Sequence, residues 1–219
     1  MSQSYFIAGT DTAVGKTHVS ALLIRALRAD GLDAAGFKPL CCGGREDAEI
    51  LAAAAGDRLA LNEVNPVWLR PAVAPYVAAM IEGRFVDLAL VRETFARLQM
   101  EVTSLIVEGA GGWFVPVLRD FSMADLAVEF ALPVLVVAAN RLGALNHTLL
   151  TVRAVQAAGL ECAGVILNQI KAPAEDDAAA VTNQAILEEL LGDLGVKLLG
   201  EIAYGAETLP AGILEKLRG

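Results

Sequence analysis

The chain has 219 residues, a formal net charge of -9 and a hydrophobic content of 55%. This length is close to that of one globular domain, so we expect residues 1–219 to form a single domain with a sizeable core. The acidic balance argues against a broad nucleic-acid-binding surface, because phosphate neutralisation needs clustered Lys and Arg. The sequence lacks an apolar run of roughly 18 residues and a recognisable signal peptide, so we expect no membrane association and a cytoplasmic location.

Short apolar runs rich in Val, Ile and Leu alternate with longer segments of helical spacing. In chain order we expect a strand at 5–9, a helix at 15–29, a short strand at 33–39, a helix at 47–55, an irregular connection ending in a short helix at 59–84, a helix at 86–101, a strand at 103–109, a helix at 123–130, a strand at 133–140, a helix at 145–158, a strand at 162–168, a mobile loop at 171–180 leading into a helix at 176–191, and a strand at 196–202. Strands without polar alternation are covered on both faces, so the pattern predicts a three-layer α/β/α fold with a mainly parallel central sheet.

The strongest motif, Gly-Thr-Asp-Thr-Ala-Val-Gly-Lys-Thr at residues 9–17, lies between the first strand and the first helix. Gly15, Lys16 and Thr17 supply backbone amides at a helix start, an ammonium group and a hydroxyl for Mg²⁺, which together suit a nucleoside triphosphate. Five residues separate Gly9 from Gly15, one more than in the usual P-loop. The alternative is a glycine-containing turn with an exposed lysine, but the context favours a P-loop NTPase type of fold.

Two carboxylates and a second lysine are candidate partners of that loop. Glu108 follows an apolar strand and precedes a glycine-rich segment, where an acidic metal ligand commonly lies. Asp47 stands at the start of a predicted helix, where a helix cap is the commoner role on local grounds. Lys38 is either a surface charge or a second cation for phosphoryl transfer, and local sequence leaves both open.

Cysteine and histidine give no sign of a metal cage. Cys41, Cys42 and Cys162 lack CxxC spacing and are odd in number, so we interpret them as reduced thiols. The two histidines, His18 and His147, are too few for a multi-histidine zinc site.

Seven segments in order carry a family resemblance. GTDTAVGKT, FKPLCCG, EDAEIL, VEGAGGWFVP, RLGALNHTLLT, GVILNQI and LLGEIAYGAETL together resemble the dethiobiotin synthetases over nearly the full chain. The resemblance implies an enzyme that uses ATP, Mg²⁺ and CO₂ or bicarbonate to convert 7,8-diaminononanoate into dethiobiotin in biotin biosynthesis. A carbamate forms on one amine, the γ-phosphoryl group activates it, and the second amine closes the ureido ring.

The resemblance also implies roles for single residues. Lys16 would hold the β- and γ-phosphates, Thr12 the γ-phosphate, and Lys38 would bridge the carbamate and the γ-phosphate. Thr17, Asp47 and Glu108 would bind the metal. The implied nucleotide contacts are Ala13, Val14, Gly15, Lys16, Thr17, His18, Asp47, Glu108, Gly109, Ala110, Gly111, Asn168, Gln169, Ala203, Tyr204 and Gly205.

The implied substrate site involves a second subunit. Lys38 and Cys42 would contact the diamine, and Gly143, Ala144, Leu145 and Asn146 of the partner subunit would bind its distant carboxylate at a helix start. The resemblance therefore implies a homodimer. This chain departs from the family pattern at three positions: Cys42 replaces a usual Ser, Ala13 an occasional Glu, and Ala203 a Pro.

Three other functions remain as alternatives. A P-loop switch ATPase of the partitioning type usually has an additional lysine near the first glycine of the loop, and none stands between Gly9 and Thr12. An amidotransferase of cobalamin synthesis would need a further domain and a paired nucleophilic cysteine. The third is a nucleotide-binding protein without turnover.

Overall fold

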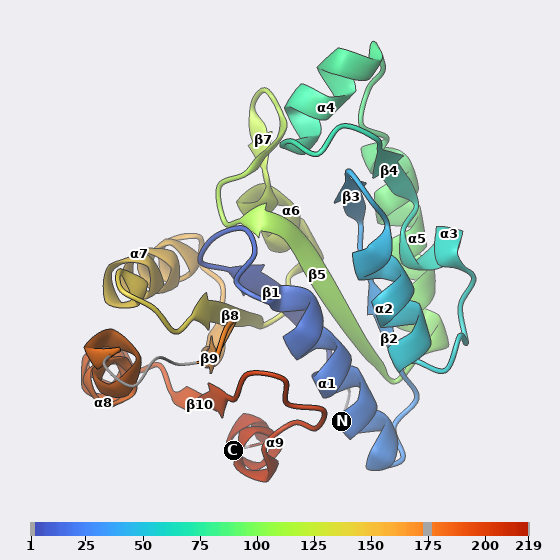
Figure 1. Ribbon diagram of the computed structural model, residues 1–219. Coiled ribbons are helices and arrows are strands. Elements are labelled where there is room, and N and C mark those ends of the chain that lie inside the picture. The colour runs from blue at the N-terminus through green and yellow to red at the C-terminus, as the bar shows by residue number, and fades with distance from the viewer. Residues whose placement is uncertain (1–2, 173–176, 219) are drawn as a thin grey trace.

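The computed structural model describes residues 3–172 and 177–218, and its centre is a six-stranded parallel sheet (Figure 1). The strand order is β10-β9-β8-β1-β5-β2, with all neighbouring strands parallel. The bounds are Tyr5–Gly9 for β1, Ala34–Phe37 for β2, Ser104–Gly112 for β5, Val134–Ala139 for β8, Cys162–Asn168 for β9 and Leu198–Ile202 for β10.

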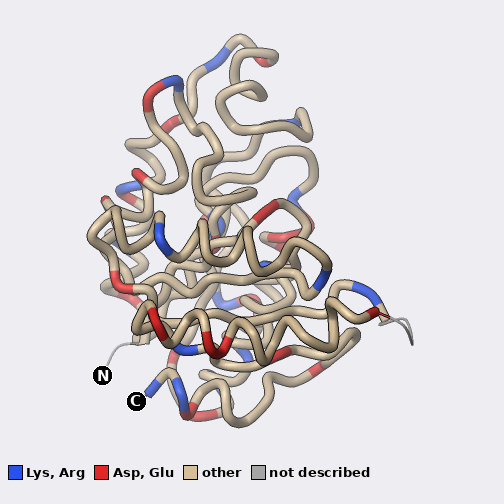
Figure 2. Tube along the Cα trace, turned by 90° about the vertical axis from the view of Figure 1, so that its left-hand side faces the viewer, with Lys and Arg blue, Asp and Glu red and all other residues tan. Residues whose placement is uncertain are grey.

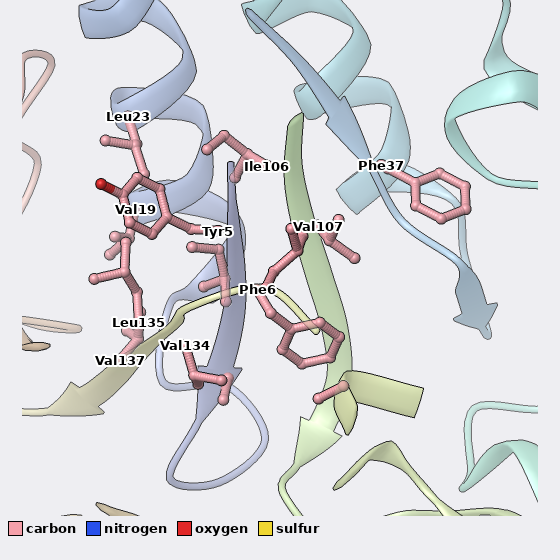
Figure 3. Close-up of a cluster of buried hydrophobic side chains, with 14 of the residues drawn as sticks. Tyr5, Phe6, Val19, Leu23, Phe37, Ile106, Val107, Val134, Leu135 and Val137 are labelled. Carbon is pink, nitrogen blue, oxygen red and sulfur yellow. The ribbon is translucent and has the colours of Figure 1, made fainter. Parts of the chain in front are cut away.

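The central strands are buried on both faces, as their unbroken apolar sequences predict. Every residue of β1 and of β8 is buried. Alternate side chains of a strand point to opposite faces. Figure 3 shows Tyr5 on the side of Val19 and Leu23, while Phe6 points to the other side. Each face of the sheet therefore has its own hydrophobic layer.

Helices cover both of these layers. Their bounds are Lys16–Ala29 for α1, Glu46–Ala54 for α2, Leu61–Val64 for α3, Pro75–Glu82 for α4, Leu88–Glu101 for α5, Met123–Phe130 for α6, Ala144–Ala157 for α7, Ala178–Gly192 for α8 and Ala211–Arg218 for α9. Figure 1 shows α1 and α2 in front of the sheet and α5 and α6 behind it. The predicted three-layer α/β/α fold is confirmed, and among the described residues no helix combines the length and apolarity needed to cross a membrane.

Two small sheets were not predicted. Strand β3, Leu40–Cys42, pairs in parallel with β4, Val67–Leu69, and β6, Pro116–Leu118, pairs antiparallel with β7, Phe121–Ser122. The segment 59–84 is thus less irregular than expected, since it contains α3 and β4 before the predicted short helix. Helix α9 was also missed.

The other predicted elements are confirmed, with small differences at their ends. Strands β1 and β9 have the predicted bounds, whereas β5 extends to Gly112. The predicted helix at 176–191 begins at Ala178. Its N-cap is Asp177, whose side chain accepts a hydrogen bond from Ala180 N. Residues 173–176 of the predicted mobile loop lie outside the described residues.

Charges are mixed over the surface. Figure 2 shows Lys and Arg positions scattered among Asp and Glu positions on the face in view. An anionic ligand of this acidic chain must therefore be met by individual, locally placed cations.

Candidate active site

The predicted phosphate and metal residues converge at the carboxyl edge of the sheet. The motif at residues 9–17, which we call the phosphate loop, begins at the end of β1. Lys38 follows β2, Glu108 lies in β5, and Asn168 ends β9. In open parallel sheets, ligands bind outside the carboxyl ends of the strands, where the strand order reverses. Strand β1 stands at such a point, because the chain continues to β2 on one side and later to β8 on the other.

The phosphate loop depends on two glycines. Gly15 has φ +87, and a Cβ atom there would lie 2.0 Å from Asn168 Nδ2. A Cβ atom at Gly9 would lie 2.8 Å from Lys16 Nζ. The loop backbone thus lies close to Lys16 and Asn168, and larger residues cannot enter.

Lys16 is held inside this loop. Its Nζ donates to Asp11 O at 3.2 Å, and the residue is 7% exposed. Burial and the neighbouring Lys38 lower the pKa of Lys16 to about 8. A triphosphate placed beside it would favour the charged form.

Three oxygen-bearing side chains meet beneath the loop. Thr17 Oγ1 lies 2.8 Å from Asp47 Oδ1 and 2.9 Å from Glu108 Oε1. Glu108 is fully buried, and its Oε2 has no hydrogen-bond partner in the described part of the chain. A buried carboxylate oxygen without a partner is costly, which makes it a natural ligand for a hard cation.

Asp47 does not cap its helix, so the local preference for a cap is wrong. The N-cap of α2 is Arg45, and Asp47 lies in the first turn. Its carboxylate instead contacts Thr17 and Lys38. The residue type was compatible with both roles, and only the tertiary contact separates them.

Lys38 joins the two carboxylates. Its Nζ lies 2.5 Å from Glu108 Oε1, 2.9 Å from Asp47 Oδ2 and 3.3 Å from Gly109 O. Burial alone would lower the pKa of Lys38, but the two carboxylates outweigh it and hold the pKa above that of an ordinary lysine. Partial burial would raise the pKa of Asp47, and Lys38 with Thr17 reverses this and lowers it. Lys38 is therefore a buried cation and not a surface charge.

Two pockets meet at this cluster, and we name each after the ligand that the family resemblance implies for its residues. The first, which we call the nucleotide pocket, has a volume of about 560 Å³ and is lined by Thr12, Ala13, Gly15, Lys16, Thr17, His18, Lys38, Asp47, Glu108, Gly111, Asn168, Gln169, Ile170, Tyr204 and Gly205. The second, the substrate pocket, has a volume of about 370 Å³ and is lined by Thr12, Lys38, Leu40, Cys41, Cys42, Gly44, Asp47, Ala72, Val73, Ala74, Pro75, Ala110, Gly111 and Val115. They share Thr12, Lys38, Asp47 and Gly111.

Some predicted residues lie outside both pockets. Val14 is a buried residue of the loop, Gly109 contacts Lys38 through its carbonyl oxygen, and Ala203 is exposed just after β10. Residues 143–146 form the start of α7, and none of them lines either pocket. Within one chain the structure does not bring this helix start to Lys38.

Sequence reasoning missed one wall of the substrate pocket. Val73, Ala74 and Pro75 line it at the start of α4. They reach it because β4, just before them, pairs with β3, which carries Cys42. Two three-residue strands give no periodic signal, so no local pattern could have indicated this wall.

Comparisons with known proteins point to one family. A family model described as an AAA domain matches residues 3–210. The chain is 43% identical over 212 residues to the ATP-dependent dethiobiotin synthetase of Akkermansia muciniphila, covering 97% of each chain. It is 44% identical to that of Anaeromyxobacter dehalogenans, covering 97% of this chain and 98% of the relative, and 35% identical to that of Escherichia coli O157:H7, covering 95% and 93%.

Solved structures show the same fold at low identity. A putative plasmid partition protein from Borrelia burgdorferi bound to AMPPNP has a TM-score of 0.57 and 12% identity, with 99% of this chain and 96% of that chain covered. The septum site-determining protein MinD from Pyrococcus horikoshii, complexed with Mg-ADP, has a TM-score of 0.57 and 17% identity, with 98% and 86% covered. These likenesses concern the fold alone, whereas the relatives of similar sequence share one name. The chain belongs to the ATP-dependent dethiobiotin synthetase family.

Proposed function

We propose that this protein converts 7,8-diaminononanoate, CO₂ and ATP into dethiobiotin, ADP and phosphate. The observation that carries the proposal is the junction of the two pockets at Thr12 and Lys38. A reaction that moves a phosphoryl group onto a second substrate needs both substrates to meet at a cation. The names of the relatives agree with this reaction.

The proposed steps place charge where the lysines lie. One amine of the diamine attacks CO₂ and loses a proton, which gives a carbamate. A carbamate oxygen attacks the γ-phosphorus of ATP, and ADP leaves. The second amine attacks the carbamoyl carbon of the mixed anhydride, the ureido ring closes, and phosphate leaves.

The chain contributes orientation and electrostatics to these steps. Lys16 would hold the β- and γ-phosphates, and Thr12 would contact the γ-phosphate from the junction. Lys38 would balance the carbamate and the transferring phosphoryl group, which both develop negative charge at the junction. Val73 and Val115 give the substrate pocket an apolar wall, which limits access of water to the mixed anhydride.

The residues present also fit Mg²⁺. Thr17, Asp47 and Glu108 would hold the ion, and the partnerless Glu108 Oε2 supports this set. The proposed set has only two carboxylates and one hydroxyl, and Mg²⁺ commonly completes its coordination with waters and phosphate oxygens. When bound, Mg²⁺ would neutralise the triphosphate and stabilise the leaving group.

The remaining nucleotide contacts concern the base. We propose that Asn168, Gln169, Tyr204 and Gly205 border the base, because all four line the nucleotide pocket and follow or end strands β9 and β10 beside the phosphate loop. Ala203, which lies just before them, belongs to the same segment.

We also propose a homodimer in which residues 143–146 of the partner subunit bind the substrate carboxylate. Exposed apolar side chains lie beside this helix: Leu142, 88% exposed, precedes it, and Leu150 on the helix, 61% exposed, lines a hollow together with Phe114, 70% exposed. A cluster of exposed apolar side chains is typical of an interface. One hydrophobic core runs through the described residues, which supports a single domain, and a cytoplasmic location would supply ATP and the diamine.

The test is to measure ADP release with ATP and Mg²⁺, with and without the diamine and bicarbonate, and to identify the product by mass spectrometry. Dethiobiotin formed in step with ADP supports the proposal. ATP hydrolysis that ignores the diamine would favour the switch ATPase, and nucleotide binding without hydrolysis would indicate a binding protein. Sedimentation analysis tests the dimer independently.

A further inference from the structure

A hydrogen-bonded chain of side chains begins at Gln169 in the wall of the nucleotide pocket. The Glu201 carboxylate, on β10, accepts through Oε1 from Asn140 Nδ2 at 2.7 Å and from Gln169 Nε2. Gln169 lines the nucleotide pocket, whereas Glu201 and Asn140 do not. These three residues follow or belong to adjacent strands, since β8, β9 and β10 are neighbours.

Asn140 is itself fixed by other groups. Its Oδ1 accepts from Asn183 Nδ2 at 2.8 Å, and its Nδ2 also donates to Ala180 O at 2.9 Å. Asn140 is 2% and Asn183 4% exposed. A buried amide with both ends satisfied has one orientation, so Asn140 presents a donor to Glu201.

This arrangement settles the orientation of the Gln169 amide. A carboxylate only accepts hydrogen bonds, so Gln169 must turn its Nε2 towards Glu201. Gln169 lines the nucleotide pocket, so Oε1 is the amide atom that remains to accept a hydrogen bond from a ligand there. Asn168 is arranged in the same sense: its Nδ2 donates to Val14 O at 3.0 Å, and its Oδ1 has no partner within the described residues.

We propose that Glu201 is a positioning residue that sets the nucleotide preference of this enzyme by holding Gln169 with its acceptor towards the base. The inference rests on the proposed function, because it assumes that the base lies beside Gln169. An acceptor at that position selects a base with an exocyclic amino group, as in adenine. It disfavours the keto isostere hypoxanthine, which places an acceptor against an acceptor.

The matched probes are ATP and ITP, which differ at the 6-position of the purine. Leaving one buried acceptor without a donor costs about 10- to 100-fold in affinity, so wild-type protein is expected to prefer ATP over ITP by that factor. Glu201→Met removes the acceptor that orders Gln169 and frees the amide to rotate. The preference, measured as the ratio of equilibrium affinities and of kcat/KM, should fall by about tenfold.

Two kinds of variant separate positioning from general damage. Glu188→Met makes the same replacement on the exposed face of α8 and should leave the ratio unchanged. Glu201→Asp keeps the carboxylate but withdraws it by one methylene, so the ratio should fall even if the methionine variant does not fold. A purely structural role would weaken ATP and ITP alike and leave the ratio at the wild-type value.

A double-mutant cycle tests the route through Gln169. Gln169→Met should lower the ratio as much as Glu201→Met, and the double variant should lower it no further. A wild-type ratio near one, an unchanged ratio in the Glu201 variants, or an additive double variant would each overturn the inference. The ratio of ATP to ITP affinities is measured by binding and does not depend on product formation. Absence of dethiobiotin would therefore refute the proposed function but would leave this test valid.

Discussion

Replacement of Lys38 by methionine tests the buried ion pair on which the proposed site depends. Lys38 is 3% exposed and Glu108 fully buried, and their charged atoms lie 2.5 Å apart. Removing one partner of a buried pair leaves the other charge uncompensated, which costs about 3–5 kcal/mol. Asp47 adds little to this figure, because its side chain is 49% exposed.

Thermal unfolding without metal or nucleotide measures the effect. For a domain of this size the loss corresponds to a fall in Tm of roughly 6–20 °C. The control is Arg92→Met, which removes an exposed ion pair with Glu129 and should cost less than about 1 kcal/mol. Mg²⁺ should restore part of the loss in the Lys38 variant, by about 2.7 kcal/mol at a concentration near 100 times its Kd.

Two results would refute this reasoning. If Lys38→Met were no less stable than Arg92→Met, the buried pair would not contribute as its geometry indicates. If Mg²⁺ raised the Tm of neither wild type nor variant, Glu108 would not be a metal ligand. Dethiobiotin formation should be lost in the variant in either case, because no other buried cation in the described part of the chain stands at the junction of the pockets.

Three further predictions concern the phosphate loop and the substrate pocket. Gly15→Ala should lower the affinity for ATP, measured by calorimetry, by at least about tenfold. The control is Gly31→Ala, which has a similar φ of +83 but open space around it and should leave the affinity unchanged. Equal loss of affinity in both variants would mean that the contact of Gly15 with Asn168 is irrelevant. Burial raises the pKa of Cys42 to about 11. The rate of its alkylation by iodoacetamide, followed by peptide mass spectrometry, should therefore rise nearly tenfold per pH unit between about pH 7 and 10. A rate that does not change with pH would contradict this. Cys42→Ser should lower the Michaelis constant for the diamine by about two- to tenfold with little change in kcat, because a hydroxyl is the stronger donor; an unchanged or higher constant would contradict it.

The sequence predicts the large elements well because their signals are local. Strand β9 was predicted to the residue, because a short apolar run that contains Val and Ile and lies between turns is typical of a strand covered on both faces. The pairing of β3 with β4 could not be predicted, because three-residue strands carry no period and their contact depends on the tertiary fold.

The site residues likewise divide into those that a local motif predicts and those that only the tertiary fold brings together. Gly15, Lys16 and Thr17 lie in one motif, and their convergence follows from adjacency along the chain. Lys38 and Asp47 were ambiguous because a helix start and a strand end each allow several roles. Lys38 meets Glu108, which is distant in sequence, through the parallel register of β2 with β5, and Asp47 joins this pair through Lys38.

The same register explains how this acidic chain holds Lys38 in a buried position. Glu108 offers two oxygens: Oε1 contacts both Lys38 and Thr17, whereas Oε2 has no partner in the described structure. A metal held by Oε2 alone would leave the Lys38 pair intact, while one held by Oε1 would compete with Lys38 for that oxygen. In the first case Mg²⁺ stabilises wild type and Lys38→Met about equally; in the second the variant gains more, because the ion has no ammonium group to displace. A larger Mg²⁺-dependent shift in Tm for Lys38→Met than for wild type would therefore show that the ion and the Lys38 ammonium group compete for Glu108.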